Sequence, residues 1–379
     1  MKIAFVTLGY RPLRTSGLDL SGERLVTALL DAGHEITVIA GKREKTREVH
    51  VHPNLEIHRI QLDPSDWIGF AYRAAKHLSV LDQFEVIHFW DIHFGWAFRG
   101  EFIGSLQHSF RQRMRSLDLV SKRGFSWISR MLYYRLAYQM AELPTLKRAG
   151  GLIAGSATTR DEFVRYYGVS PECVSIAPHG VDTQFFCPSN RIDSLRKQHK
   201  LKDGERTILF AGFITRRKGL EILARALPLI EPIPRLIILG KWRSESYRRE
   251  VYDLLRPCEQ HVIEIGFAPD EAMPDYYSLA DVYVSTSFLE GFGLPLAESL
   301  SCETPVVALE AGSVAEVVGE GGILISENNP VIIAAAITDL LQDEEGRKAM
   351  GKRGRKHIEN EFSIQSMLSK TLEAYMRFK

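Results

Sequence analysis

Short apolar runs that favour β-strands alternate along the chain with stretches whose apolar positions recur at helical spacing. The alternation opens with KIAFVTLGY and HEITVIA, and it starts afresh in the second half with TILFAGF and RLIILG. Continuous apolar strands separated by helices are typical of parallel sheets that are covered on both faces. The pattern therefore predicts an α/β chain with two Rossmann-like domains, one in each half.

The first strand is followed by a stretch rich in Gly and Ser, RPLRTSGLDLSGERL. We predict a loop there, with an amphipathic helix beginning at Leu25 and closed by Gly33. The loop lacks the spacing G-x-G-x-x-G, which argues against a dinucleotide site. Later, Ser156 is predicted to cap a helix that runs through Tyr167 and ends at Gly168.

Composition narrows the class of protein. With 379 residues, 45% of them hydrophobic and 25% charged, the chain has the composition of a globular protein of two or three domains. A net charge of +1 does not by itself indicate a polyanionic partner. The four cysteines form no C-x-x-C pair, the chain opens directly on a strand, and no apolar run approaches the length of a membrane span. We therefore expect a cytoplasmic location.

The stretch DVYVSTSFLEGFGLPLAES places two carboxylates around one turn. It predicts a strand over 282–284, a loop through Gly291 and Gly293, and a helix that begins at Pro295. Amides at a helix start favour phosphate, whereas Glu290 and Glu298 suit sugar hydroxyls, so together they indicate a nucleotide sugar. An ordinary βα turn with a glutamate that caps the helix fits the spacing equally well.

The segment EGFGLPLAE resembles the E-x7-E signature of the retaining glycosyltransferases of family 4, and the likeness extends over most of the chain. The resemblance implies the GT-B fold, in which two Rossmann-like domains with parallel sheets face each other across a cleft. It implies an acceptor-binding domain over 1–188, a donor-binding domain over 200–359, and a last helix over about 360–379 that packs back on the first. The polar segment Pro188–Asp203 is the predicted linker.

The same resemblance implies roles for individual residues. Glu290 would orient the sugar hydroxyls, Glu298 would bind the ribose, and Lys218 in FITRRKG would neutralise the donor diphosphate, an electrostatic task. Phe213 stands where the family usually has an arginine, so Arg216 or Arg217 would substitute for it. The remaining candidates are His108 against the transferred sugar, and Gly17, Gly22, Arg217, Gly266, Phe267, Gly291, Phe292, Gly293 and Leu294 around the donor.

A cluster of His88, Trp90, Asp91 and His93 follows a predicted strand. It offers groups for a metal, although such residues also serve as hydrogen-bonding loop residues. No D-x-D pair occurs in the sequence, so a metal-bridged diphosphate is not expected. The resemblance implies no cofactor, because the nucleotide sugar is a substrate.

Residues 99–148 carry ten basic and three acidic side chains, a local net charge of +7, with seven aromatic residues interleaved. This combination suits an anionic membrane surface, and hence peripheral attachment at the inner face of the membrane. A phosphate-bearing acceptor or a solvated helical face would explain it as well. Nucleic acid is not expected, because no nucleic-acid motif accompanies the charge.

We therefore predict a metal-independent hexosyltransferase that moves a sugar from a UDP- or GDP-sugar to a glycan, lipid-linked or small-molecule acceptor. Two alternatives stay open. One is another GT-B sugar-nucleotide enzyme, such as an epimerase, and the other is a non-catalytic protein that binds sugar nucleotides.

Overall fold

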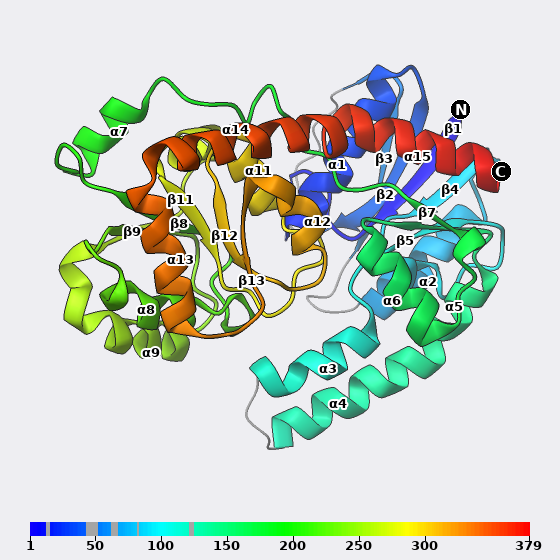
Figure 1. Ribbon diagram of the computed structural model, residues 1–379. Helices are drawn as coiled ribbons and strands as arrows, with labels where there is room; N and C mark the ends of the chain where they lie inside the picture. Colours follow the sequence, from blue (N-terminus) through cyan, green and yellow to red (C-terminus); the bar gives the residue numbers. More distant parts are fainter. Residues whose placement is uncertain (13–15, 43–51, 62–66, 82, 121–124) are drawn as a thin grey trace. The chain divides into compact units, whose positions relative to one another are not determined.

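The computed structural model describes residues 1–12, 16–42, 52–61, 67–81, 83–120 and 125–379. The chain divides into two compact units, one formed by Met1–Gly180 with Ile364–Lys379 and the other by Val181–Ser363. Each unit contains one parallel sheet with helices on both faces, as the alternation of apolar strands and helical patterns predicts (Figure 1). The two sheets confirm the predicted fold class.

The sheet of unit 1 has the order β3-β2-β1-β4-β5-β6-β7 and all of its pairings are parallel. Its strands are β1 (Lys2–Thr7), β2 (Glu35–Lys42), β3 (Leu55–Gln61), β4 (Val86–Phe89), β5 (Ile103–Leu106), β6 (Gly151–Ala154) and β7 (Val174–Ile176). Its helices are α1 (Gly17–Asp31), α2 (Trp67–Leu78), α3 (Phe110–Val120), α4 (Phe125–Ala137), α5 (Leu143–Arg148), α6 (Ala157–Tyr167) and α15 (Ile364–Phe378). The strand order changes direction between the adjacent strands β1 and β4, so the switch point of the sheet lies between their carboxyl ends.

Both faces of the first sheet are buried by apolar side chains. One face packs on α1 and α15, which Figure 1 shows running beside each other, and includes Leu29 and Tyr375. The other face packs on α2, α5 and α6, and includes Phe70 and Phe163. Helix α6 has the predicted cap at Ser156 and ends at Gly168 in the left-handed conformation.

The predicted start of α1 at Leu25 is wrong by eight residues. The helix begins at Gly17, because Ser16 and Asp19 form a capping box that satisfies the first free N–H groups. The Gly and Ser residues that we assigned to a loop therefore lie in the first turns of the helix.

The sheet of unit 2 has the order β10-β9-β8-β11-β12-β13, again with parallel pairings throughout. Its strands are β8 (Thr207–Ala211), β9 (Arg235–Leu239), β10 (Val262–Gly266), β11 (Val282–Ser285), β12 (Val306–Leu309) and β13 (Gly322–Ile325). Its helices are α7 (Ile192–Gln198), α8 (Leu220–Ala226), α9 (Glu245–Leu255), α10 (Met273–Leu279), α11 (Leu294–Ser301), α12 (Val314–Val318), α13 (Pro330–Gln342) and α14 (Glu344–Glu361). The switch point lies between β8 and β11.

Helices α8, α9 and α13 cover one face of the second sheet, and α10, α11, α12 and α14 cover the other. The segment that we predicted to link the domains contains α7, which packs against α10 through Ile192 and Leu195. The chain passes from α14 of unit 2 to α15 of unit 1 over Phe362 and Ser363.

Candidate functional site

Two loops meet at the switch point of the second sheet, where ligands of open α/β sheets bind. The loop after β8 ends in the short 3₁₀ helix η4 (Arg216–Lys218), and the loop after β11 runs from Thr286 to Gly293. Their backbones are joined, since Thr286 Oγ1 donates to Gly219 O at 2.8 Å and Phe288 N donates to Arg217 O at 2.9 Å. Gly219 has a φ of +65°, and a Cβ there would clash with Thr286 O. The approach therefore requires glycine.

A third loop, which follows β12, closes against the second. Ser313 Oγ donates to Gly291 O at 2.6 Å. Gly312 has a φ of +60°, and a Cβ there would overlap Glu290 O. We call residues 216–219, 286–293 and 310–313 the loop cluster. Each of its loops follows the carboxyl end of a neighbouring strand, so the sheet fixes their spacing.

Two predicted residues, Lys218 and Glu290, form an ion pair at the centre of the loop cluster. The Lys218 ammonium bonds Glu290 Oε1, and the Arg217 guanidinium lies 3.8 Å from Glu290 Oε2. Glu290 is only 7% exposed. Burial alone would raise the pKa of Glu290, but Lys218 and Arg217 outweigh it and hold that pKa below its ordinary value. Glu290 is therefore an ionised, buried acceptor for hydrogen bonds.

The second predicted acid, Glu298, lies in α11. This helix begins at Leu294, one residue before the predicted start, so that Glu298 lies in its second turn rather than its first. Glu298 is buried and accepts a hydrogen bond from the Tyr277 hydroxyl at 3.0 Å. Burial and the Glu298 carboxylate raise the pKa of Tyr277 well above its usual range, so the phenol remains a donor. Gly293 caps the helix with a φ of 92°.

The other residues of the motif that were predicted to lie around the sugar donor can offer it only their main chain, not their side chains. The Phe292 ring is buried in the core and packs against Phe362, which leaves only its main chain for a ligand. Leu294 likewise packs against the core. Gly291 O is already bonded to Ser313. The side-chain chemistry of the motif therefore belongs to its two glutamates.

The carboxyl edge of the same sheet also carries two exposed aromatic rings. Phe267 follows Gly266 at the end of β10, is 67% exposed, and has Lys241 Nζ 4.9 Å from its ring centre. Phe213 follows β8 and has the Arg243 guanidinium 4.3 Å from its ring centre. A planar apolar face beside a cation is suited to a nucleobase or a phosphate group.

Arg216 and Arg217 were the two candidates to replace the arginine that the family usually has at Phe213, and in the structure they have different partners. Arg216 donates to both carboxylate oxygens of Glu250, at 3.0 and 2.5 Å, and lies over the Tyr247 ring. Arg217 instead faces Glu290 and donates to Leu289 O. Arg217 therefore faces the Lys218–Glu290 pair, whereas Arg216 is turned away from it toward Glu250.

Unit 1 has a similar edge, at the carboxyl ends of β1, β4 and β5. Gly17 is the first residue of α1, so its N–H lies at the helix start. Gly22 lies inside α1, where a Cβ would meet the Trp90 ring. The predicted loop at Gly22 is therefore wrong, because its N–H belongs to the helix body, whereas its role around the donor stays a prediction. His108 follows β5 and has Nδ1 3.2 Å from Gln112 Oε1.

The histidine cluster at the end of β4 makes hydrogen bonds to other side chains of unit 1. His88 bonds Tyr375 and Ser105, each at 2.7 Å. His93 bonds Asp91 through one ring nitrogen and Glu142 through the other, the latter at 2.9 Å. Burial lowers the pKa of His93, but the two carboxylates outweigh it and raise that pKa to about 9. Over the residues that the structure describes, no group of three or more His, Cys, Asp or Glu is placed to hold a metal ion.

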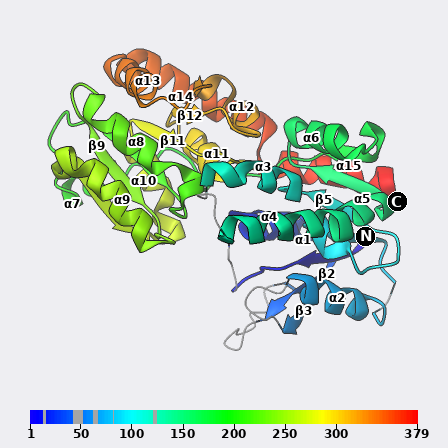
Figure 2. The ribbon, with the colours of Figure 1, turned by 90° about the horizontal axis from the view of Figure 1, so that it is seen from below.

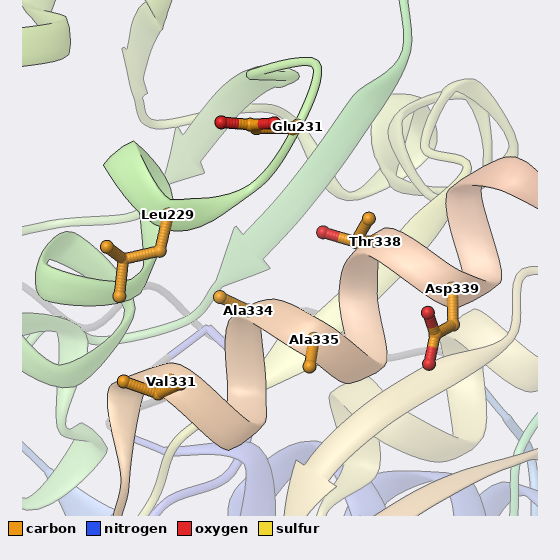
Figure 3. A pocket seen from close by; sticks show the side chains of 7 residues that line it. All are labelled: Leu229, Glu231, Val331, Ala334, Ala335, Thr338 and Asp339. Carbon is orange, nitrogen blue, oxygen red and sulfur yellow. The ribbon is translucent and has the colours of Figure 1, made fainter.

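A separate hollow in unit 2 lies between α13 and the residues that precede β9 (Figure 3). It is lined by Leu229, Glu231, Val331, Ala334, Ala335, Thr338 and Asp339. Its two carboxylates and aliphatic side chains include no cation for a phosphate, so we assign it no part in donor binding.

Three residues of the site were missed by the sequence reasoning. Tyr277 and Ser287 donate to Glu298 and Glu290 respectively, and Arg243 lies over Phe213. Ser287 could have been found, because it lies within the loop that carries Glu290. Tyr277 and Arg243 gave no such signal, since only the packing of the helices and strands brings them to the site.

The part of the chain that the structure describes contains no helix both long and apolar enough to cross a bilayer.

Two family descriptions match the chain in succession. Residues 16–185 match "Glycosyltransferase Family 4", and residues 191–357 match "Glycosyl transferases group 1". Among curated proteins, the D-inositol 3-phosphate glycosyltransferase of Paenarthrobacter aurescens is 26% identical over 413 residues, which cover 98% of this chain and 97% of that protein.

Solved structures show the same fold. Sucrose-phosphate synthase from Thermosynechococcus elongatus superposes with a TM-score of 0.81 at 22% identity, covering 99% of this chain and 98% of the other. The Anabaena protein HepE, in complex with UDP-glucose, gives a TM-score of 0.76 at 17% identity and covers 98% of both chains.

Proposed function

Because this chain belongs to the family 4 glycosyltransferases, we propose that it transfers a sugar from a nucleoside diphosphate sugar to an acceptor with retention of the anomeric configuration. The observation that carries the proposal is the ion pair of Lys218 with the buried Glu290 in the loop cluster. The pair sets a fixed cation beside an ionised acceptor at the switch point of a parallel sheet. A glycosyl diphosphate needs both chemistries within one site.

Each charged group has a distinct task in this proposal. The Lys218 ammonium, supported by Arg217, neutralises the charge that develops on the departing diphosphate, which lowers the barrier to breaking the glycosidic bond. The Glu290 carboxylate accepts hydrogen bonds from the sugar hydroxyls and thereby orients the ring. Before the donor binds, Glu290 holds the Lys218 ammonium in place. When the donor binds, the ammonium leaves Glu290 and bonds the diphosphate.

The nucleoside would be held by the neighbouring groups of unit 2. Glu298, fixed by Tyr277, accepts from the ribose hydroxyls, and the exposed ring of Phe267 covers the base. That the Anabaena neighbour is described with UDP-glucose supports a nucleotide sugar as the donor. His108 and Gly17 of unit 1 stay predictions for contacts with the transferred sugar and the phosphates.

For the acceptor we propose a hydroxyl of a glycan, of a lipid-linked sugar or of a small molecule. The described relative acts on D-inositol 3-phosphate, which supports a polyhydroxylated acceptor. The charged groups of the loop cluster themselves supply the stabilisation of the leaving group, so the proposal needs no metal ion and no further cofactor.

The test is a panel of UDP- and GDP-sugars in which released nucleotide and glycosylated product are measured together. Retention is read from the anomeric proton of the product by NMR. We expect Glu290→Gln to abolish transfer. Glu250→Gln is the matched control, because Glu250 also pairs with a basic residue of η4 but lies outside the loop cluster. Equal activity of wild type and Glu290→Gln would refute the proposed role.

The arginines give a second matched comparison. Arg217→Ala should weaken donor binding, because it removes a guanidinium that faces Glu290, whereas Arg216→Ala should leave it unchanged. Nucleotide release without transfer to any acceptor would favour a hydrolase or an epimerase. Binding without turnover would favour a non-catalytic protein.

A further inference from the structure

Helix α4 carries a row of large apolar side chains that face solvent. Phe125 is 89% exposed, Ile128, Leu132 and Leu136 are each roughly half exposed, and Met140, in the π-turn that continues α4, is 74% exposed. Their spacing of three or four positions places them on one side of the helix. We call these five residues the α4 ridge. Such contiguous exposed apolar surface is uncommon on a monomeric soluble protein.

The opposite side of α4 is already occupied. Helices α3 and α4 lie side by side (Figure 2). Phe110 of α3 packs against the rings of Tyr133 and Tyr134, and the Tyr133 hydroxyl accepts a hydrogen bond from Trp67 Nε1 at 2.6 Å. The helix is therefore held in place by one face, and the α4 ridge is left for another partner.

Charge around the ridge narrows the choice of partner. The sequence has no Asp or Glu between residues 119 and 141 but four basic residues, of which Arg130 and Arg135 lie on α4 and are exposed. Lys122 and Arg123 lie outside the described residues. On the helix, Arg135 falls on one flank of the ridge, about 80° from its centre, and Arg130 falls about 140° from the centre, toward the packed side. An apolar face on a helix that carries cations and no acids is the pattern of helices that lie in an anionic lipid interface.

A second copy of this chain fits the ridge less well. A two-fold contact would bring Arg130 and Arg135 near their own counterparts, with no acid on either helix to compensate. An anionic lipid headgroup supplies the missing negative charge, and the acyl chains take up the apolar side chains.

We propose that the α4 ridge docks this protein on an anionic lipid bilayer, with α4 lying in the plane of the interface. The helix is too short to cross, since its 13 residues span about 20 Å against a hydrocarbon core of about 30 Å. Phe125 and Leu132 enter the acyl boundary while Arg130 and Arg135 contact headgroups. The inference rests on unit 1 alone and does not depend on the proposed donor chemistry.

The test is co-sedimentation of the full chain with vesicles of phosphatidylcholine containing about 30% phosphatidylglycerol, compared with vesicles of pure phosphatidylcholine. We expect binding to the anionic vesicles that weakens with salt. Arg130→Gln with Arg135→Gln should lower the partition coefficient about 25-fold, or about fivefold for each cation. Leu132→Ser with Leu136→Ser should lower it at least about tenfold.

The control variant is Val331→Ser with Ile332→Ser, which removes two exposed aliphatic side chains from α13 of unit 2 and should bind as wild type. Circular dichroism and a melting curve verify that each variant is folded.

The proposal is overturned if wild type fails to bind anionic vesicles at low salt, or if both α4 variants bind like wild type. It is also overturned if lipid-free protein is a dimer that Leu132→Ser with Leu136→Ser dissociates, because the ridge is then a contact between copies. Loss of vesicle binding with intact sugar transfer separates this inference from the proposed function.

Discussion

Replacing Lys218 by methionine removes the ammonium that pairs with Glu290 and keeps most of the side-chain length. Glu290 is 7% exposed, so its carboxylate cannot regain water when the partner is lost. Burial then raises the pKa of Glu290, and only Arg217, 3.8 Å away, and the hydrogen bond from Ser287 oppose that rise. We therefore expect Lys218→Met to lose both transfer activity and stability, and the two losses have the same cause.

The size of the stability loss follows from the geometry. Breaking a fully buried ion pair by removing one partner costs about 3–5 kcal/mol. Because Arg217 remains near Glu290, we expect about 2–3 kcal/mol for Lys218→Met. Glu290→Gln should cost less, about 1–2 kcal/mol, because the Lys218 side chain is 14% exposed and can turn its ammonium toward water. The double variant should then lose about 1–3 kcal/mol less than the sum of the single losses.

Urea unfolding of wild type, the two single variants and the double variant measures this coupling. The exposed pair of Arg216 and Glu250 provides the control cycle, for which we expect a coupling below about 1 kcal/mol. The lowered pKa of Glu290 means that its contribution is present above the ordinary carboxyl pKa and is lost as pH falls through the folded value. A Lys218–Glu290 coupling as small as that of the control pair would refute the reasoning.

Three further predictions concern other contacts. Tyr277→Phe removes the hydrogen bond to Glu298, so the KM for the donor should rise several-fold with little change in kcat, and an unchanged KM would rule out this support of the acid. Gly312→Ala should abolish transfer, because a Cβ there displaces Glu290 O. The control variant Gly204→Ala, at a similar positive φ with open space around it, should only cost about 1 kcal/mol of stability. Equal transfer activities of the two variants would contradict this prediction. Because the pKa of His93 is raised, its contribution is complete below about pH 6.5 and is lost as pH rises through about 9, which amounts to at most about 3 kcal/mol of unfolding free energy. Denaturant unfolding across this pH range should show the loss in wild type and a flatter profile in His93→Gln, and identical profiles would contradict it.

Local sequence signals predicted several of the strands and helices and part of the site. Apolar runs marked β1, β2, β8, β9 and β11, because a strand buried on both faces needs continuous hydrophobicity. The start of α1 was placed wrongly because the Gly and Ser residues around Gly17 were taken as loop signals, whereas the capping box of Ser16 and Asp19 starts a helix there. The segment predicted as a linker forms α7, which the sequence alone did not reveal because its apolar positions are few.

The sequence alone determined that this is an α/β chain with two parallel sheets, and its motif brought attention to Glu290, Glu298 and Lys218. The fold class and the motif can be seen in short stretches of sequence, because they depend on the spacing of apolar residues and on the positions of glycine and proline. Only the tertiary structure decided that Lys218 pairs with Glu290, that Arg217 rather than Arg216 faces this pair, and that Tyr277 holds Glu298. Those contacts join residues 21 to 73 positions apart in the sequence. Lys218 and Arg217 reach Glu290 because strand order places β8 beside β11, and Tyr277 reaches Glu298 because α10 packs against α11. No local pattern encodes either arrangement.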